Sequence, residues 1–278
     1  MSTRPDAVWY TPDSRANRLD RWTTTAYQGG HVLWLRGPGS AASQVRSVEP
    51  QYQEVAWAPP VGSDWTHALF SPEPAPSIKV RSVLELLTEI LTLQRCPDLY
   101  FGLALDWYKI PDSTISSYDW LNTPNGDLVH RGKYWYKNDR DEQSKVGRQL
   151  AQNMVNVFNR HAALDRATVV LDVPGHDATR LSFGSRLAAT IAAMQHKDMV
   201  KVRTRSQFRP EAKNLSGPDR SRIFQDEFYI ADDIRGMHVV IIDDVFKSGT
   251  SLGAVAKAAR NAGALTVAGF AAVRTLSS

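Results

Sequence analysis

Two adjacent carboxylates, Asp243 and Asp244, follow a run of four β-favouring apolar residues at 239–242. A short loop rich in hydroxyl side chains spans 247–251, and the pattern of 252–262 predicts a helix. A strand, a loop and a helix N-terminus in this order can hold a phosphate, because amides, hydroxyls and the helix dipole favour an anion. The carboxylates repel a phosphate, so we expect them to accept hydrogen bonds from a vicinal diol on the same ligand. The alternative is a buried strand whose last Asp caps the helix.

The stretch from 239 to 251 resembles the fingerprint of the type I phosphoribosyltransferases. The resemblance implies that Asp243 and Asp244 are the catalytic pair and meet the ribose hydroxyls of phosphoribosyl pyrophosphate (PRPP). It also implies that the next loop cradles the 5-phosphate of PRPP. The residues of this loop are Lys247, Ser248, Gly249, Thr250 and Ser251. The sequence departs from the common pattern at Lys247, where Thr or Ser is usual, and at Thr250, where a small residue is common.

Composition and charge place the chain among ordinary folded proteins. It has 278 residues, 42% of them hydrophobic and 22% charged, enough for one large domain or two modest ones. The net charge of +4 suits an anionic ligand without requiring nucleic acid. The polar N-terminus and the lack of a long apolar run predict a cytoplasmic protein without a membrane segment. The single cysteine, Cys96, excludes intrachain disulfides and a cysteine-based zinc cluster.

The aromatic residues divide the chain. All eight Trp and eight of the nine Tyr lie before residue 137, so we predict an N-terminal extension at 1–128 and a phosphoribosyltransferase-like domain at 129–278. The aromatics at 120 and 134–136 are interleaved with basic residues. They can stack a base or a nucleic acid strand, or they can form the edge of an ordinary core.

Strand, loop and helix patterns repeat in the second half. They predict an α/β fold with a doubly wound parallel sheet, in which ligands bind beyond the carboxyl ends of the strands. The predicted strands are 167–173, 239–242 and 266–273, and the predicted helices are 139–163, 181–194 and 252–262. In the first half, the patterns predict strands at 31–36, 53–58 and 128–136 and a helix at 78–93. Residues 98–110 fit either a strand or a helix.

Residues from about 129 onward are similar to the competence-protein ComF-like branch of the phosphoribosyltransferases. The similarity rests on His130-Arg131-Gly132-Lys133-Tyr134, on Val173-Pro174 with Arg180 and Phe183-Gly184, and on Arg203, Gln207, Arg220 and Phe228. The segment 182–185 lacks the family's usual order. The Cys-rich zinc module of many relatives is missing as well.

Two further segments can hold the pyrophosphate. The loop Pro174, Gly175, His176 and Asp177 follows the strand at 167–173 and can present backbone amides to it, as the family's pyrophosphate loop does. His176 either donates to the diphosphate or faces solvent. Residues 201–222 hold seven basic residues against two acidic ones, and form either a mobile lid that excludes water or a solvated loop. The lid residues that we expect to act are Arg203, Arg205, Lys213 and Arg220.

Together these features predict a Mg-dependent phosphoribosyltransferase, in which PRPP carries the Mg²⁺ and the protein supplies no direct metal ligand. The acceptor is a small molecule, expected to be a nucleobase. Because the chain stops after 266–273, we expect the hood over the acceptor to come from 1–128. The alternative is a regulatory or DNA-processing accessory protein that binds PRPP or a nucleotide without turnover. Nucleic acid association and a homodimer are further expectations.

Overall fold

The larger part of the chain is an α/β unit built on one sheet. The computed structural model describes residues 16–55, 64–94, 96, 98–112, 114–136, 138–177, 179–208, 224 and 226–276. Seven strands form the sheet in the order β1-β6-β7-β13-β12-β8-β9, and the strands from β7 to β9 are parallel. Their bounds are β1 (Ala16–Asn17), β6 (Leu91–Leu93), β7 (Phe101–Trp107), β13 (Thr266–Arg274), β12 (His238–Phe246), β8 (Val169–Asp172) and β9 (Asp198–Val200).

Helices cover both faces of this sheet, which confirms the predicted doubly wound α/β fold. The side chains of Val240 and Ile242 pack with those of α4 (Arg140–Phe158) and α6 (Phe183–Met194) on one face. Val239 and Ile241 pack with α8 (Thr250–Asn261) on the other. β12 is therefore buried on both sides, which explains why its sequence is apolar without alternation.

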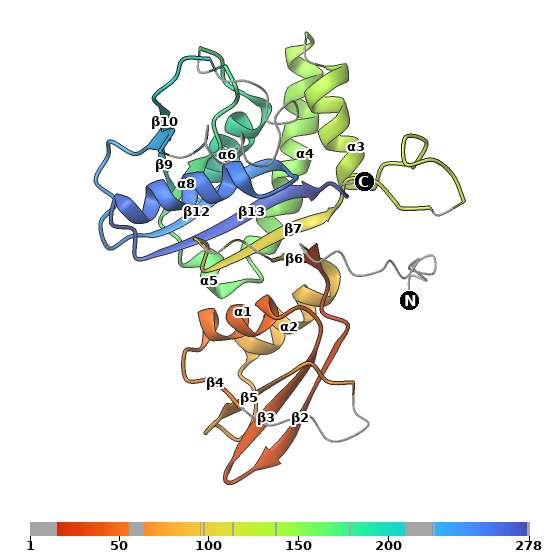
Figure 1. Cartoon of the computed structure of the whole chain (residues 1–278), viewed down its shortest axis with the longest axis vertical. Coiled ribbons are helices and arrows are strands. Elements are labelled where there is room, and N and C mark those ends of the chain that lie inside the picture. The colour runs from red at the N-terminus through yellow and green to blue at the C-terminus, as the bar shows by residue number, and fades with distance from the viewer. Residues whose placement is uncertain are drawn as a thin grey trace.

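A smaller unit precedes the sheet in the chain. Its four antiparallel strands, in the order β2-β3-β5-β4, carry two helices on the side that faces the larger unit (Figure 1). The bounds are β2 (Arg21–Tyr27), β3 (Gly30–Arg36), α1 (Ser40–Val48), β4 (Gln53–Glu54), β5 (His67–Ser71) and α2 (Ile78–Glu89). β1, β6 and β7 also come from before residue 128, yet they belong to the larger sheet. The sheet thus spans the boundary predicted between 1–128 and 129–278, and the separate N-terminal unit ends at α2.

The described part of this smaller unit lies beside β6 (Figure 1), and its helix α1 reaches the amino ends of the parallel strands. Ser47 of α1 lines a small cavity with Phe101, His238 and Thr266, the first residues of three parallel strands. This position is at the opposite end of the strands from Asp243 and does not suit the predicted hood. Among the described residues before 128, the loop between β7 and α3 (Pro124–His130) extends past the carboxyl ends (Figure 1).

The predicted strand at 128–136 is wrong, because this segment is helical. α3 is followed by a π-helical turn, η1 (Arg131–Trp135). The side chain of Thr123 accepts a hydrogen bond from the Gly126 amide at 3.0 Å, and Pro124 occupies the first turn, so a helix begins here. Residues 98–110 contain strand β7. The helix predicted at 78–93 ends at Glu89, because 91–93 pair with β7 as strand β6.

Two glycines offer a matched test of this packing. A β-carbon at Gly126 would lie 1.9 Å from the carbonyl oxygen of Tyr108, so the backbone of α3 or of the segment after β7 must move. We expect Gly126→Ala to lower the free energy of unfolding by about 2 kcal/mol or more. Gly253 lies in α8 with nothing within 4 Å of its β-carbon position. Gly253→Ala is therefore expected to stabilise the protein by about 0.5–1 kcal/mol. Urea unfolding of the two variants measures both effects, and equal effects would contradict this packing.

Candidate functional site

The acid pair lies near the carboxyl end of the central strand β12. Asp243 pairs in register with Ala271 of β13, whereas β8 ends opposite Ile242, so both carboxylates lie beyond the end of β8. The backbone amide of Asp244 donates to Oδ1 of Asp243 at 2.9 Å. Gly184, in the first turn of α6, packs against Asp244: a β-carbon there would lie 3.5 Å from the Asp244 nitrogen. The start of α6 thus forms one wall of the site.

A lysine from a distant segment pairs with Asp244. Nζ of Lys133 lies 2.8 Å from Oδ2 of Asp244, and the two side chains are 36% and 10% exposed. Burial alone would lower the pKa of Lys133, but the charge and hydrogen bond of Asp244 outweigh it, so this pKa is raised. Gly132 brings η1 against Phe183, because a β-carbon there would lie 2.5 Å from the Phe183 ring. The turn that carries Lys133 is therefore packed on the start of α6.

Asp243 is the member of the pair whose ionisation is costly. Burial, and then the negative charge of Asp244, raise the pKa of Asp243 far above its usual range, although Lys133 opposes the shift. Two carboxylates this close resist being ionised together, because neither is fully solvated. A ligand that brings hydroxyl donors or positive charge relieves this cost. The arrangement is chemically suited to a diol or to a cationic complex.

The loop after the acid pair has the geometry that the sequence indicates. Gly249 has φ of 80°, a left-handed conformation, and a β-carbon there would lie 2.9 Å from the Phe246 ring, so two constraints favour glycine. α8 begins at the next residue. The hydroxyls of Ser248 and Thr250 lie 3.0 Å apart, and Lys247 is exposed. Backbone amides and hydroxyls therefore gather at a helix N-terminus immediately after the acid pair.

The loop 174–177 follows β8 on the neighbouring strand. A β-carbon at Gly175 would lie 3.1 Å from Cβ of Ser182, so the loop is close to the start of α6. Oδ1 of Asp177 accepts hydrogen bonds from the hydroxyl and the amide of Thr179, at 2.5 and 2.9 Å, and they lower the pKa of Asp177. Asp177 therefore stabilises a turn of its own loop, and His176 is exposed.

Only the base of the predicted lid lies within the described residues. β10 (Arg203–Thr204) pairs with β11 (Phe228–Tyr229) as a two-stranded ribbon. Arg205 donates to the carbonyl of Asp226 at 2.8 Å and stacks over the Tyr229 ring, while Arg203 is exposed. Arg205 thus holds the ribbon together. Lys213 and Arg220 lie outside the described residues.

Three residues near the acid pair were not predicted as site residues. Besides Lys133, these are Tyr108 and His130: the Tyr108 hydroxyl lies 3.0 Å from Nδ1 of His130. Burial is the largest cause that raises the pKa of Tyr108 to about 12, and Asp244 contributes to the shift. His130 and Lys133 carried a signal only through the family resemblance. Tyr108 carried none, because its segment fits a strand or a helix.

The ion pair between Lys133 and Asp244 makes a testable contribution to stability. We expect Lys133→Met to lower the free energy of unfolding at neutral pH by about 1–2 kcal/mol, between the values for exposed and buried pairs, because it leaves Asp244 without its cation. The matched control is Lys145→Met, which removes an exposed pair with Glu142 on α4. The control is expected to leave the unfolding curve almost unchanged. Equal effects of the two variants would show that Lys133 acts as an ordinary surface charge.

The described residues contain no helix that is long and apolar enough to cross a membrane. Within the same residues there is no group of three or more His, Cys, Asp or Glu side chains placed to hold a metal ion.

Comparison with known proteins gives weak similarities only. No protein-family model and no curated protein matches the sequence. Among solved structures, the chain is similar to phosphoribosylpyrophosphate synthetase from Mycobacterium smegmatis, with 20% identity and a TM-score of 0.32, over 46% of this chain and 34% of that one. An adenine phosphoribosyltransferase matches with 18% identity and a TM-score of 0.32, over 46% and 71% of the two chains. A hypoxanthine phosphoribosyltransferase from Staphylococcus aureus matches with 15% identity and a TM-score of 0.29, over 44% and 62%. Similarity at this level does not carry a function to this chain.

Proposed function

We propose that this protein is a phosphoribosyltransferase that uses MgPRPP as donor and belongs with the type I, ComF-like enzymes that its sequence resembles. One observation carries the proposal: the adjacent carboxylates Asp243 and Asp244 lie near the carboxyl end of the buried central strand β12, and a hydroxyl-rich loop at a helix N-terminus follows the end of that strand. A ligand that joins a diol to a phosphate matches both halves of this site.

In this proposal the acid pair accepts hydrogen bonds from the 2- and 3-hydroxyls of the ribose. The loop 247–251 binds the 5-phosphate through its amides, its hydroxyls and the charge of Lys247. The diol brings two hydrogen-bond donors to two carboxyl groups that lie close together and are largely buried. PRPP binding therefore relieves the electrostatic cost that raises the pKa of Asp243.

The diphosphate of MgPRPP lies, in the same proposal, against the loop Pro174, Gly175, His176 and Asp177 and under the basic residues Arg203, Arg205, Lys213 and Arg220. The Mg²⁺ would enter as part of the substrate and would offset part of the negative charge of the diphosphate that these residues bind. During transfer, a nitrogen lone pair of the acceptor forms a bond to C1 of the ribose. The C1–O bond breaks with its electron pair leaving on pyrophosphate, and the acceptor's proton passes to solvent. Positioning and charge stabilisation supply most of the rate, without a protein nucleophile.

The acceptor is proposed to be a flat nucleobase-like molecule bound near 107–135. Tyr134 and Trp135 pack against the His130 ring, at centroid distances of 5.3 Å, and both remain exposed. Exposed aromatic faces next to a reactive site are well suited to stacking a base. This segment, and not the N-terminal sheet, then takes the role of the hood.

A second candidate is a protein that binds PRPP or a nucleotide without transferring it. The ion pair between Lys133 and Asp244 favours this candidate, because it already occupies one oxygen of the acid pair. The basic charge of the chain then serves association with nucleic acid.

One experiment separates the two candidates. The protein is incubated with MgPRPP and a panel of purines, pyrimidines and related bases, while pyrophosphate release and PRPP binding are followed together. Release with at least one base supports the transferase. Tight binding without release for any base supports the non-catalytic protein, and absence of PRPP binding contradicts both.

A further inference from the structure

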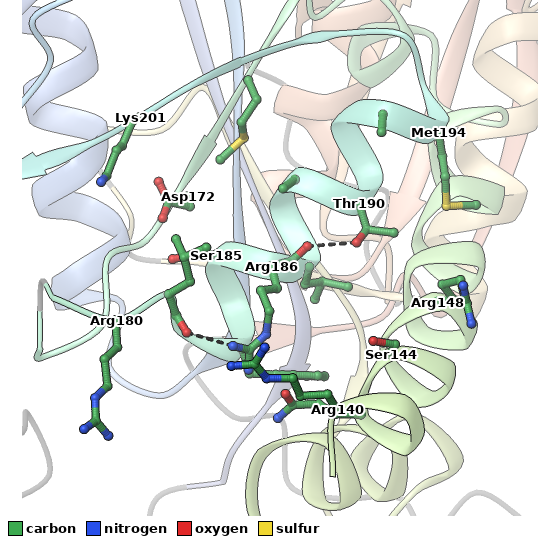
Figure 2. A pocket seen from close by; sticks show the side chains of 18 residues that line it. Arg140, Ser144, Arg148, Asp172, Arg180, Ser185, Arg186, Thr190, Met194 and Lys201 are labelled. Atoms are coloured by element: carbon green, nitrogen blue, oxygen red, sulfur yellow. Dashed lines mark hydrogen bonds between the residues drawn. The ribbon is translucent and has the colours of Figure 1, made fainter. Parts of the chain in front are cut away.

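A large cleft runs along α6, with α4 on one side and the ends of β8 and β9 on the other, outside the site described above. Its volume is about 1300 Å³, and neither the acid pair nor the loops at 174–177 and 247–251 line it. The first turn of α6 separates the two sites: Gly184 packs on Asp244, while Ser185 and Arg186 line the cleft. Figure 2 shows side chains from α4, α6 and the ends of β8 and β9 around this space.

Several positively charged side chains line the cleft, and three of them are not paired with acidic side chains of the described residues. Three arginines, Arg140 and Arg148 from α4 and Arg186 from α6, line it, and none has a carboxylate within ion-pair distance among the described residues. Burial first, and then the like charge of Arg140, lower the pKa of Arg186. Two guanidinium groups that repel each other gain from an anion placed between them.

The cations are spread along the cleft. Arg140 and Arg148 are two turns apart on α4, about 12 Å along the helix axis. Arg180 and Lys201 line the other side, and Arg180 is only loosely paired with Asp177, at 3.8 Å. A single phosphate is too small to reach all of these groups. The charge pattern fits a ligand that carries two or more phosphates.

Among the described residues that line the cleft, Asp172 is the one carboxylate, and one of its oxygens lacks a hydrogen-bond donor. Asp172, the last residue of β8, is 5% exposed, and its Oδ1 is buried without a partner. A buried carboxylate oxygen without a donor is costly, so the Asp172 carboxylate favours a ligand that brings a hydroxyl or an amine into the cleft. An inorganic polyphosphate could donate a hydrogen bond to Asp172 only from a protonated phosphate oxygen. That protonation would remove negative charge that the arginines bind.

The remaining wall is apolar. Leu187, Met194 and Met199 line the cleft beside the charged groups. Methionine sulfur is polarizable and packs well against aromatic rings. The cleft therefore combines a cationic end, a hydrogen-bond acceptor and a soft apolar surface.

We infer that this cleft binds a nucleotide with two or more phosphates, at a site separate from the acid pair. The phosphates lie between Arg140 and Arg186, Asp172 accepts a hydrogen bond from a sugar hydroxyl or a base amine, and the base packs on Met199, whose strand β9 pairs with β8. Because α6 borders both sites, a ligand in the cleft contacts the helix that also packs on Asp244.

Binding of ADP, measured by isothermal titration calorimetry in buffer without Mg²⁺, tests this inference. Wild-type protein is expected to bind ADP, and Arg140→Ala and Arg186→Ala are each expected to weaken binding at least tenfold. Asp172→Asn is expected to weaken ADP binding less, because an amide oxygen still accepts one hydrogen bond. Lys79→Ala, an exposed change on α2, is the matched loss of charge and leaves affinity unchanged.

Two further arms define the site and the ligand. Asp243→Asn/Asp244→Asn is expected to keep wild-type affinity for ADP, and tripolyphosphate is expected to bind more weakly than ADP. Failure of the wild type to bind ADP, or wild-type affinity in the two arginine variants, overturns the inference. Loss of ADP binding in the acid-pair variant assigns ADP to the other site. Equal affinity for tripolyphosphate shows that the cleft recognises only phosphate.

Discussion

Asp243→Asn/Asp244→Asn is expected to abolish PRPP binding, with a loss of affinity of at least about 100-fold. Each carboxylate that accepts a hydroxyl of the diol makes a charge-assisted hydrogen bond, worth about 1.5–3 kcal/mol. An amide keeps the shape of the side chain but loses the charge and turns half of its polar surface into a donor. Titration calorimetry with MgPRPP measures the loss directly.

The chain offers a matched control in a second pair of adjacent aspartates. Asp232 and Asp233 are exposed in the turn before β12, and Asp233 is paired with Arg235 at 2.7 Å. Asp232→Asn/Asp233→Asn removes the same charge from the protein without touching the site. This control is expected to bind PRPP as the wild type does. Unchanged affinity in the acid-pair variant would contradict the diol assignment and, with it, the proposed function.

Asp243→Asn alone is expected to stabilise the unliganded protein at pH 8 while weakening PRPP binding. The pKa of Asp243 is raised in the folded protein, first by burial and then by Asp244, so the folded state binds more protons than the unfolded state above about pH 4. Stability therefore falls as the pH rises from the unfolded pKa toward the folded one. An asparagine side chain at position 243 does not titrate, so the variant avoids this loss of stability. Each pKa unit is worth about 1.4 kcal/mol, which corresponds to roughly 2–4 °C in melting temperature.

The pH dependence distinguishes this effect from general repacking. The gain from Asp243→Asn is expected to shrink as the pH falls toward 4, because the carboxyl is then protonated in the folded state and increasingly protonated in the unfolded state as well. Asp233→Asn should show the opposite sign: its hydrogen bonds with Arg235 lower the pKa of Asp233 to about 2, so its ionised form stabilises the fold above the unfolded pKa. Thermal melts of both variants from pH 4 to 8 compare the two. A lower melting temperature for Asp243→Asn at pH 8 would show that Asp243 is ionised without cost.

A gain in stability together with a loss of binding has a simple physical meaning. Holding the two carboxyl groups close together and partly buried lowers the stability of the folded state. Selection for stability alone would remove such a pair. A ligand that supplies two hydroxyl donors recovers that cost on binding. PRPP is therefore expected to raise the melting temperature of the wild type more than that of Asp243→Asn.

The central segment of the site, residues 239–251, can be predicted from the sequence because its residues are close together in the chain. Residues 239–242 are apolar without alternation, which is sufficient for a strand buried on both faces, and the acid pair, Gly249 and the hydroxyls follow within one short segment. The helices α4 and α6 are predicted for the same reason, since their apolar residues repeat with the helical period over many turns. The doubly wound class follows from the order of these elements.

The tertiary structure decides what depends on segments that are far apart in the chain. Lys133 meets Asp244 only because η1 packs on the start of α6. The segment 128–136 is short and rich in aromatics, so its pattern fits a strand until Thr123 and Pro124 are seen to begin a helix. β6 and β7 join the large sheet through backbone pairing, which side-chain pattern does not encode, and this draws the N-terminal unit toward the amino ends of the strands. The sequence by itself determines that an acid pair, a glycine and several hydroxyls follow the central strand, while packing between distant segments decides that Lys133 pairs with Asp244 and that Tyr108 meets His130.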